Sequence, residues 1–136
     1  MNPGELFEAS SPLARQVARL GGDPIAAARA ALAELSEEEK VATLDAHPRI
    51  GAPTAAMSER SRREQGAKAE ASVLAELERL NSEYEAKFGF RFVVFVAGRS
   101  RAQVLEVLRG RLARSREDEM REGLEAIIAI AENRAR

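Results

Sequence analysis

The chain has 136 residues with one histidine and no cysteine, so His47 is the side chain best suited to acid/base chemistry near neutral pH. An imidazole in solution has a pKa near about 6.5, and it can both accept and donate a proton under cellular conditions. His47 is followed by Pro48 at the point where a predicted helix gives way to a loop. A lone histidine is also often a surface or core residue without a catalytic role, so its position alone leaves both interpretations open.

The rest of the composition argues against several other kinds of chemistry. Without cysteine there is no thiol catalysis, no cysteine-based zinc site and no disulfide scaffold. No second histidine stands at helical spacing from His47, and zinc or iron would therefore need several converging carboxylates. We expect no metal site.

The charge pattern argues against nucleic acid and membrane partners. The 21 basic and 22 acidic residues nearly balance and are interleaved along the chain, which leaves no basic patch for nucleic acid. No run approaches the roughly 18 apolar residues of a membrane span, and residues 1–5 lack the basic and apolar regions of a signal peptide. We expect a cytoplasmic protein.

The elements that must position His47 are predicted to be helices of one domain, residues 1–136. Alanine, leucine, glutamate and arginine dominate, and aromatic residues make up only 4%. Caps and apolar spacing predict helices over 25–35, from Ser36 to His47, from Ser58 or Ser61 to about Lys87, from Ser100, and from Ser115 to Arg134. The fold class is therefore all-α, a single-domain helical bundle.

One segment breaks the helical pattern. Gly89 ends the long helix, and the aromatic and β-branched run at about 90–96 would by itself be a buried strand. A single strand cannot make a sheet, so we predict a short extended connector. Its backbone groups then need unusual partners, for which a bound ligand is one candidate.

Several short motifs occur in a characteristic order along the chain. The motifs are Phe7-Glu8-Ala9-Ser10, His47-Pro48-Arg49-Ile50-Gly51, Ser61-Arg62-Arg63-Glu64-Gln65, Asn81…Tyr84…Lys87-Phe88-Gly89-Phe90-Arg91-Phe92, and Arg134. This order, from about Phe7 to Arg134, resembles the 2-oxo-4-hydroxy-4-carboxy-5-ureidoimidazoline (OHCU) decarboxylase family. That family is all-helical, free of cofactors and commonly dimeric, and it forms (S)-allantoin and carbon dioxide in the last step of urate degradation.

The resemblance implies a role for individual residues in this chain. His47 and Glu64 are the implied catalytic residues. The implied substrate-binding residues are Pro48, Ser61, Gln65, Gly89, Phe90, Arg91, Phe92 and Arg134. The implied partners are a small-molecule ureide and a second copy of the chain. The chain departs from the family's usual pattern at Leu13, where an aromatic residue is common, and at Ala135, where leucine is usual.

The residues themselves allow simpler interpretations. Glu64 lies three residues after Ser61 and could only complete a helix capping box. Arg134 could only complement the negative end of its helix dipole. The phenylalanines of the connector are expected in the core, with only the backbone between Gly89 and Phe92 touching a substrate. Two other functions also stay open: a diverged ureide-binding module without activity, and a related ureide lyase or hydrolase.

Overall fold

The computed structural model describes residues 3–50 and 67–136, and in these ranges it contains helices and no strand. The helices are α1 (Pro3–Leu6), α2 (Pro12–Leu20), α3 (Pro24–Glu34), α4 (Glu37–Asp45), α6 (Ala67–Phe88), α7 (Arg101–Arg111) and α8 (Arg116–Ala135). The all-α prediction is confirmed. Helices α1 and α2 are additions that the sequence patterns above do not identify, while the predicted caps Ser58 and Ser61 lie outside the described residues.

Polar caps begin the predicted helices, as their local sequences indicate. The Asp23 carboxylate accepts a hydrogen bond of 2.9 Å from the Ala26 amide at the start of α3. Capping boxes begin α4 at Ser36 and α7 at Ser100, and the Ser115 hydroxyl caps α8. Each cap satisfies amide donors that would otherwise have no partner in the first turn.

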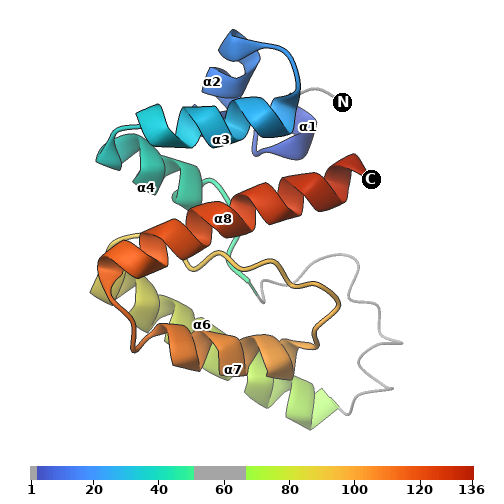
Figure 1. Ribbon diagram of the computed structural model, residues 1–136. Coiled ribbons are helices and arrows are strands. Elements are labelled where there is room, and N and C mark those ends of the chain that lie inside the picture. Colours follow the sequence, from blue (N-terminus) through green and yellow to red (C-terminus); the bar gives the residue numbers. More distant parts are fainter. Residues whose placement is uncertain (1–2, 51–66) are drawn as a thin grey trace.

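Helix α8 crosses the middle of the molecule, with α1 to α4 on one side and α6 and α7 on the other (Figure 1). It contacts α1, α3 and α4 directly, while α6 packs along α7. Close approach to α4 occurs at Gly123, where an added Cβ would lie 2.8 Å from a methyl group of Leu44. Helix α4, which precedes His47, is thereby packed closely against α8.

The predicted connector is extended and buried. Gly89 ends α6 with a φ of 84°, a backbone conformation that glycine adopts without steric cost. Phe90 and Phe92 are each 1% exposed. Their rings lie 6.0 and 5.4 Å from the Tyr84 ring of α6, measured between centroids. The connector therefore crosses the molecule with these two aromatic side chains packed in the core.

A buried polar network joins the connector to three helices. The Glu119 carboxylate, fully buried on α8, accepts hydrogen bonds of 2.7 Å from both the Tyr84 hydroxyl and the Arg111 Nε. Arg111 Nη1 donates to the Val93 carbonyl at 2.9 Å, and its guanidinium lies 4.7 Å from the centre of the Phe92 ring. Burial, followed by the adjacent Glu119 carboxylate, raises the pKa of Tyr84, so the hydroxyl remains a donor.

Replacing Glu119 by alanine is expected to lower the free energy of unfolding by about 3 to 5 kcal/mol, because the Arg111 charge would stay buried without its counter-ion. Urea unfolding followed by far-UV circular dichroism measures the loss. The matched control is Glu122→Ala, which removes an exposed ion pair with Arg114 and should cost less than about 1 kcal/mol. Equal losses in the two variants would contradict the structural role given to the buried network.

Candidate active site

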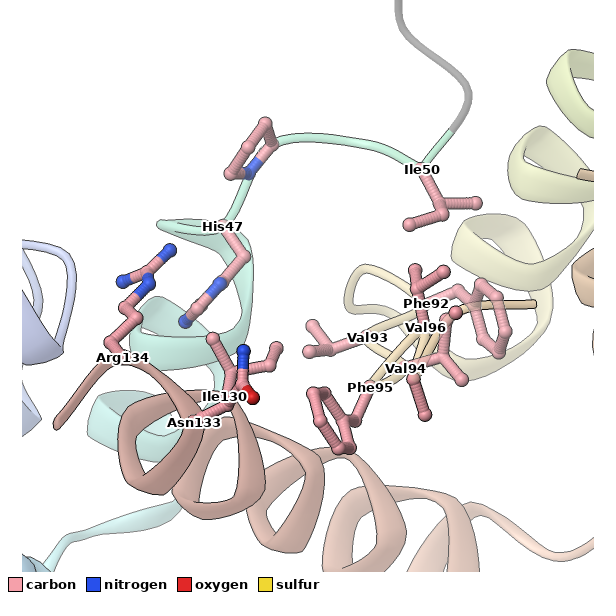
Figure 2. A pocket seen from close by; sticks show the side chains of 13 residues that line it. His47, Ile50, Phe92, Val93, Val94, Phe95, Val96, Ile130, Asn133 and Arg134 are labelled. Atoms are coloured by element: carbon pink, nitrogen blue, oxygen red, sulfur yellow. The ribbon is translucent and has the colours of Figure 1, made fainter. Parts of the chain in front are cut away.

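A cavity of about 480 Å³ lies between the end of α4, the connector and the C-terminal part of α8. It is lined by His47, Pro48, Ile50, the residues 92–98, Ile130, Asn133 and Arg134. Figure 2 shows His47, Asn133 and Arg134 together on one side, and Val93 and Val94 of the connector on the other. The cavity thus combines an apolar wall with imidazole, amide and guanidinium groups.

His47 lies two residues after the end of α4, in the turn that follows this helix. Its amide donates to the Leu44 carbonyl at 3.2 Å, and the whole residue is only 6% exposed. Pro48 disfavours helical geometry at the preceding residue, which explains why α4 ends at Asp45. The imidazole is therefore presented to the cavity from a helix end.

Arg91 of the connector holds this turn in place. Its Nη1 donates hydrogen bonds of 2.8 Å to the carbonyls of both Asp45 and His47. Its own amide donates to the Asp45 carboxylate at 2.9 Å. These bonds satisfy carbonyls that the end of a helix leaves without partners, and they tie the His47 backbone to the opposite wall of the cavity.

The residues after His47 are anchored to α6. Arg49 Nε donates to the Glu85 carboxylate at 2.7 Å, and the Asn81 amide donates to the Ile50 carbonyl at 3.0 Å. Asn81 is 1% exposed, so its bond to the carbonyl is shielded from water. His47 and Pro48 are consequently fixed at both ends, by α4 and by α6.

Two residues of opposite charge, Glu8 and Arg134, act on the His47 imidazole. His47 Nδ1 lies 3.8 Å from Glu8 Oε1, and the same oxygen lies 3.3 Å from Arg134 Nη2. Burial lowers the pKa of His47 below its usual range, and of the two smaller effects Glu8 raises it and Arg134 lowers it. The imidazole is therefore neutral at neutral pH and able to accept a proton.

The structure brings together part of the predicted site. His47, Pro48, Phe92 and Arg134 line one cavity, although they lie up to 87 positions apart in the chain. Gly89, Phe90 and Arg91 are not among its lining residues, and their contact with a ligand remains a prediction. Phe90 packs in the core, and the Arg91 side chain binds main-chain carbonyls. Ser61, Glu64 and Gln65 lie outside the described residues.

Some lining residues were missed by sequence reasoning. Ile130, Asn133 and Arg134 follow helical i, i+3, i+4 spacing, and this signal could have identified the first two as neighbours of the predicted arginine. The connector reaches the cavity through residues 92–98, further along the chain than expected. Glu8 belongs to the Phe7-Glu8-Ala9-Ser10 motif, but no local sequence pattern linked it to His47.

The described ranges contain no group of three or more histidine, aspartate or glutamate side chains that could hold a metal ion. None of the helices in residues 3–50 and 67–136 combines the length and apolar character needed to cross a membrane.

The pKa of His47 predicts how its burial affects stability at different pH. Unfolded histidine titrates at 6.5 and native His47 lower, so below pH 6.5 the unfolded chain binds more protons. Stability contributed by the neutral imidazole is fully present above that pH and is lost as pH falls through the native pKa. The loss in melting temperature from about pH 7 to about pH 5.5 should be smaller in His47→Gln than in the parent protein. Identical pH dependence in the two proteins would contradict the lowered pKa.

The matching family model and one similar solved structure are both described as OHCU decarboxylase. Residues 4–136 match the family model described as OHCU decarboxylase. A crystal structure of OHCU decarboxylase in the presence of (S)-allantoin is 26% identical with a TM-score of 0.73, and the match covers 96% of this chain and 92% of that one. A structure of (S)-allantoin synthase is 25% identical with a TM-score of 0.68, covering 97% of this chain but 46% of that chain. A comparison with curated proteins found no match.

Proposed function

Because the chain belongs to the OHCU decarboxylase family, we propose that it converts 2-oxo-4-hydroxy-4-carboxy-5-ureidoimidazoline into (S)-allantoin and carbon dioxide, a step in urate degradation. The observation that carries the proposal is the cavity in which His47, Asn133 and Arg134 face an apolar wall. Its volume of about 480 Å³ lies within the range of small-molecule sites, which is about 300 to 1,000 Å³. A small polar ureide fits this combination of size and chemistry.

The substrate accepts the electrons that decarboxylation releases. Its C4 carries both the hydroxyl and the carboxylate, and the adjacent C5 forms a double bond to a ring nitrogen. When the bond from C4 to the carboxylate breaks, its electron pair forms a C4–C5 double bond, and the C5–N electron pair moves to the nitrogen. The nitrogen then takes up a proton, the hydroxyl loses one, and C5 receives one. We therefore expect the reaction to need no cofactor.

His47 is the candidate for the transfer of the hydroxyl proton. Its neutral imidazole takes this proton as carbon dioxide departs, and the resulting imidazolium returns it to one face of C5, while a proton from solvent reaches the ring nitrogen. The lowered pKa of His47 supports the order of these steps, since the imidazole begins without its second proton. Delivery from a fixed position on one side of the ring accounts for the formation of a single enantiomer. Such acid/base assistance usually contributes about 10² to 10⁴ in rate.

Arg134 and Asn133 provide groups that can bind the ureide. The Arg134 guanidinium is held by the Leu6 carbonyl at 3.0 Å and by Glu8, and it has further N–H groups for a ligand. We assign them to a ring or ureido oxygen, because a tight grip on the departing carboxylate would stabilise the ground state. The Asn133 amide offers the donor and acceptor pair that a ureido group requires.

The roles of the residues outside the described ranges follow from the family resemblance. Glu64 is proposed to hydrogen-bond the ureido or ring nitrogens, with Ser61 and Gln65 beside it. The same resemblance supports the proposal that the protein acts as a homodimer. The cytoplasmic location expected from the sequence patterns is kept as a separate proposal.

The chirality of the product tests the proposed activity directly. Freshly generated substrate decays spontaneously to racemic allantoin, whereas the protein should produce the (S) enantiomer, detected by circular dichroism of the product. His47→Ala should lower this rate by about 10² to 10⁴. Racemic product with the parent protein would overturn the proposed activity and favour the ureide-binding module, while near-normal turnover by folded His47→Ala would remove the histidine from the mechanism.

Arg134→Lys tests the planar donor group separately from the charge. Lysine keeps the positive charge near the end of α8 but cannot form paired hydrogen bonds in one plane, so we expect a raised KM and a reduced kcat/KM. Steady-state kinetics measure both. The matched control is Arg29→Lys, since Arg29 forms exposed ion pairs with Glu125 and Glu132. If Arg134→Lys behaves like this control, Arg134 only complements the helix dipole.

A further inference from the structure

We propose that Glu8 is a positioning residue for this reaction: its carboxylate links the His47 imidazole to the Arg134 guanidinium and fixes how both face the cavity. The inference rests on the proposed function for its catalytic meaning, but the contacts themselves do not depend on it. Glu8 is not among the residues that line the cavity, so it acts through its two neighbours.

The geometry places one carboxylate oxygen between the two groups. Glu8 Oε1 lies 3.8 Å from His47 Nδ1 and 3.3 Å from Arg134 Nη2. The His47 side chain is 7% exposed and the Glu8 side chain 30%, so the carboxylate stands between the buried ring and the protein surface. At 3.3 Å this oxygen accepts a hydrogen bond from the guanidinium, and at 3.8 Å it acts on the imidazole ring electrostatically.

The segment that carries Glu8 is itself held firmly. Phe7 is 1% exposed, and the Glu8 carbonyl accepts a hydrogen bond of 2.9 Å from the Ser11 amide. Arg134 Nη1 donates to the Leu6 carbonyl at 3.0 Å, two residues before Glu8. The Arg134 side chain thus binds this turn twice, at the main-chain carbonyl of Leu6 and at the side-chain carboxylate of Glu8.

This position selects one tautomer of the neutral imidazole. Neutral histidine carries a single N–H, and a carboxylate beside Nδ1 favours the proton on that nitrogen. Nε2 is then left with its lone pair for the substrate. Proton transfer from the substrate hydroxyl needs this arrangement, because the opposite tautomer would present a donor where an acceptor is required.

Glu8 also offsets the charge of Arg134. Among the described residues, Glu8 from the turn after α1 and Arg134 from α8 act on the charge of His47. Arg91 of the connector binds the His47 carbonyl and, through its own amide, the Asp45 carboxylate of α4. Glu8 favours the imidazolium and Arg134 opposes it. The mechanism needs a His47 ring that is neutral at first and can then hold the transferred proton. The opposing charges of Glu8 and Arg134 together permit both the neutral imidazole and the imidazolium.

Nuclear magnetic resonance of the single histidine tests the inference without substrate. In Glu8→Gln, made in the full chain without a histidine tag, the His47 titration should move to lower pH, and its nitrogen shifts should show less of the Nδ1–H tautomer. The kcat should fall on the order of tenfold or more, as when a residue that orients a functional imidazole is removed. The limb of the pH–rate profile that follows His47 should move in the same direction as the titration.

Two comparison variants make the result decisive. Glu34→Gln removes the same charge from an exposed position at the end of α3 and should leave titration, tautomer and kcat unchanged. Glu8→Asp keeps the carboxylate and should restore part of both the tautomer and kcat, and it serves if Glu8→Gln does not fold. An unchanged His47 titration and tautomer in folded Glu8→Gln would overturn the inference even if activity fell. Failure of the proposed function would instead appear in the parent protein, as racemic product.

Discussion

The structure depends on how an extended connector without a strand partner is accommodated inside a helical protein. Its main-chain carbonyls cannot be left unpaired among apolar side chains, and arginine side chains donate to at least two of them and to one at the end of α6. Arg111 binds the Val93 carbonyl, Arg99 binds Phe95, and Arg116 binds Phe88 at the end of α6. Arginine suits this role because its planar group carries several donors at fixed angles. The charge that comes with Arg111 must then be balanced, and this explains why Glu119 is buried on α8.

The same accommodation builds one wall of the cavity. Phe90 and Phe92 lie in the core, whereas Phe95, also expected there, is half-buried and lines the cavity with the other residues of 92–98. Arg91, at the beginning of the connector, is a donor from the connector itself: its side chain donates to the carbonyls of the turn that carries His47. Packing and site geometry are therefore coupled: a change that shifts the connector also shifts the main chain that carries the imidazole.

The chemistry of the site follows from burial with few, well-placed charges. Burial makes the His47 imidazole a neutral base, and Glu8 and Arg134 act on it with opposite signs. The connector forms the apolar wall of the cavity, whereas His47, Asn133 and Arg134 supply hydrogen-bond donors and acceptors at its polar end. Groups from both termini meet here, since Glu8 and Arg134 are 126 positions apart in the sequence.

The sequence by itself determined the helical class, the caps at Asp23, Ser36, Ser100 and Ser115, and the extended connector after Gly89. It also indicated His47 as the candidate for acid/base chemistry. Caps and breaks are local, involving residues within about one turn, and therefore leave recognisable patterns. The order of the motifs also indicated the family, and the family model that matches residues 4–136 confirms it. Only the tertiary structure decided that Glu8 faces His47, that Arg91 binds the His47 carbonyl, and that the cavity is lined by residues 92–98 instead of by Gly89 and Phe90. These contacts join distant segments, and their geometry depends on the directions of side chains after the helices have packed, which periodicity and spacing do not encode.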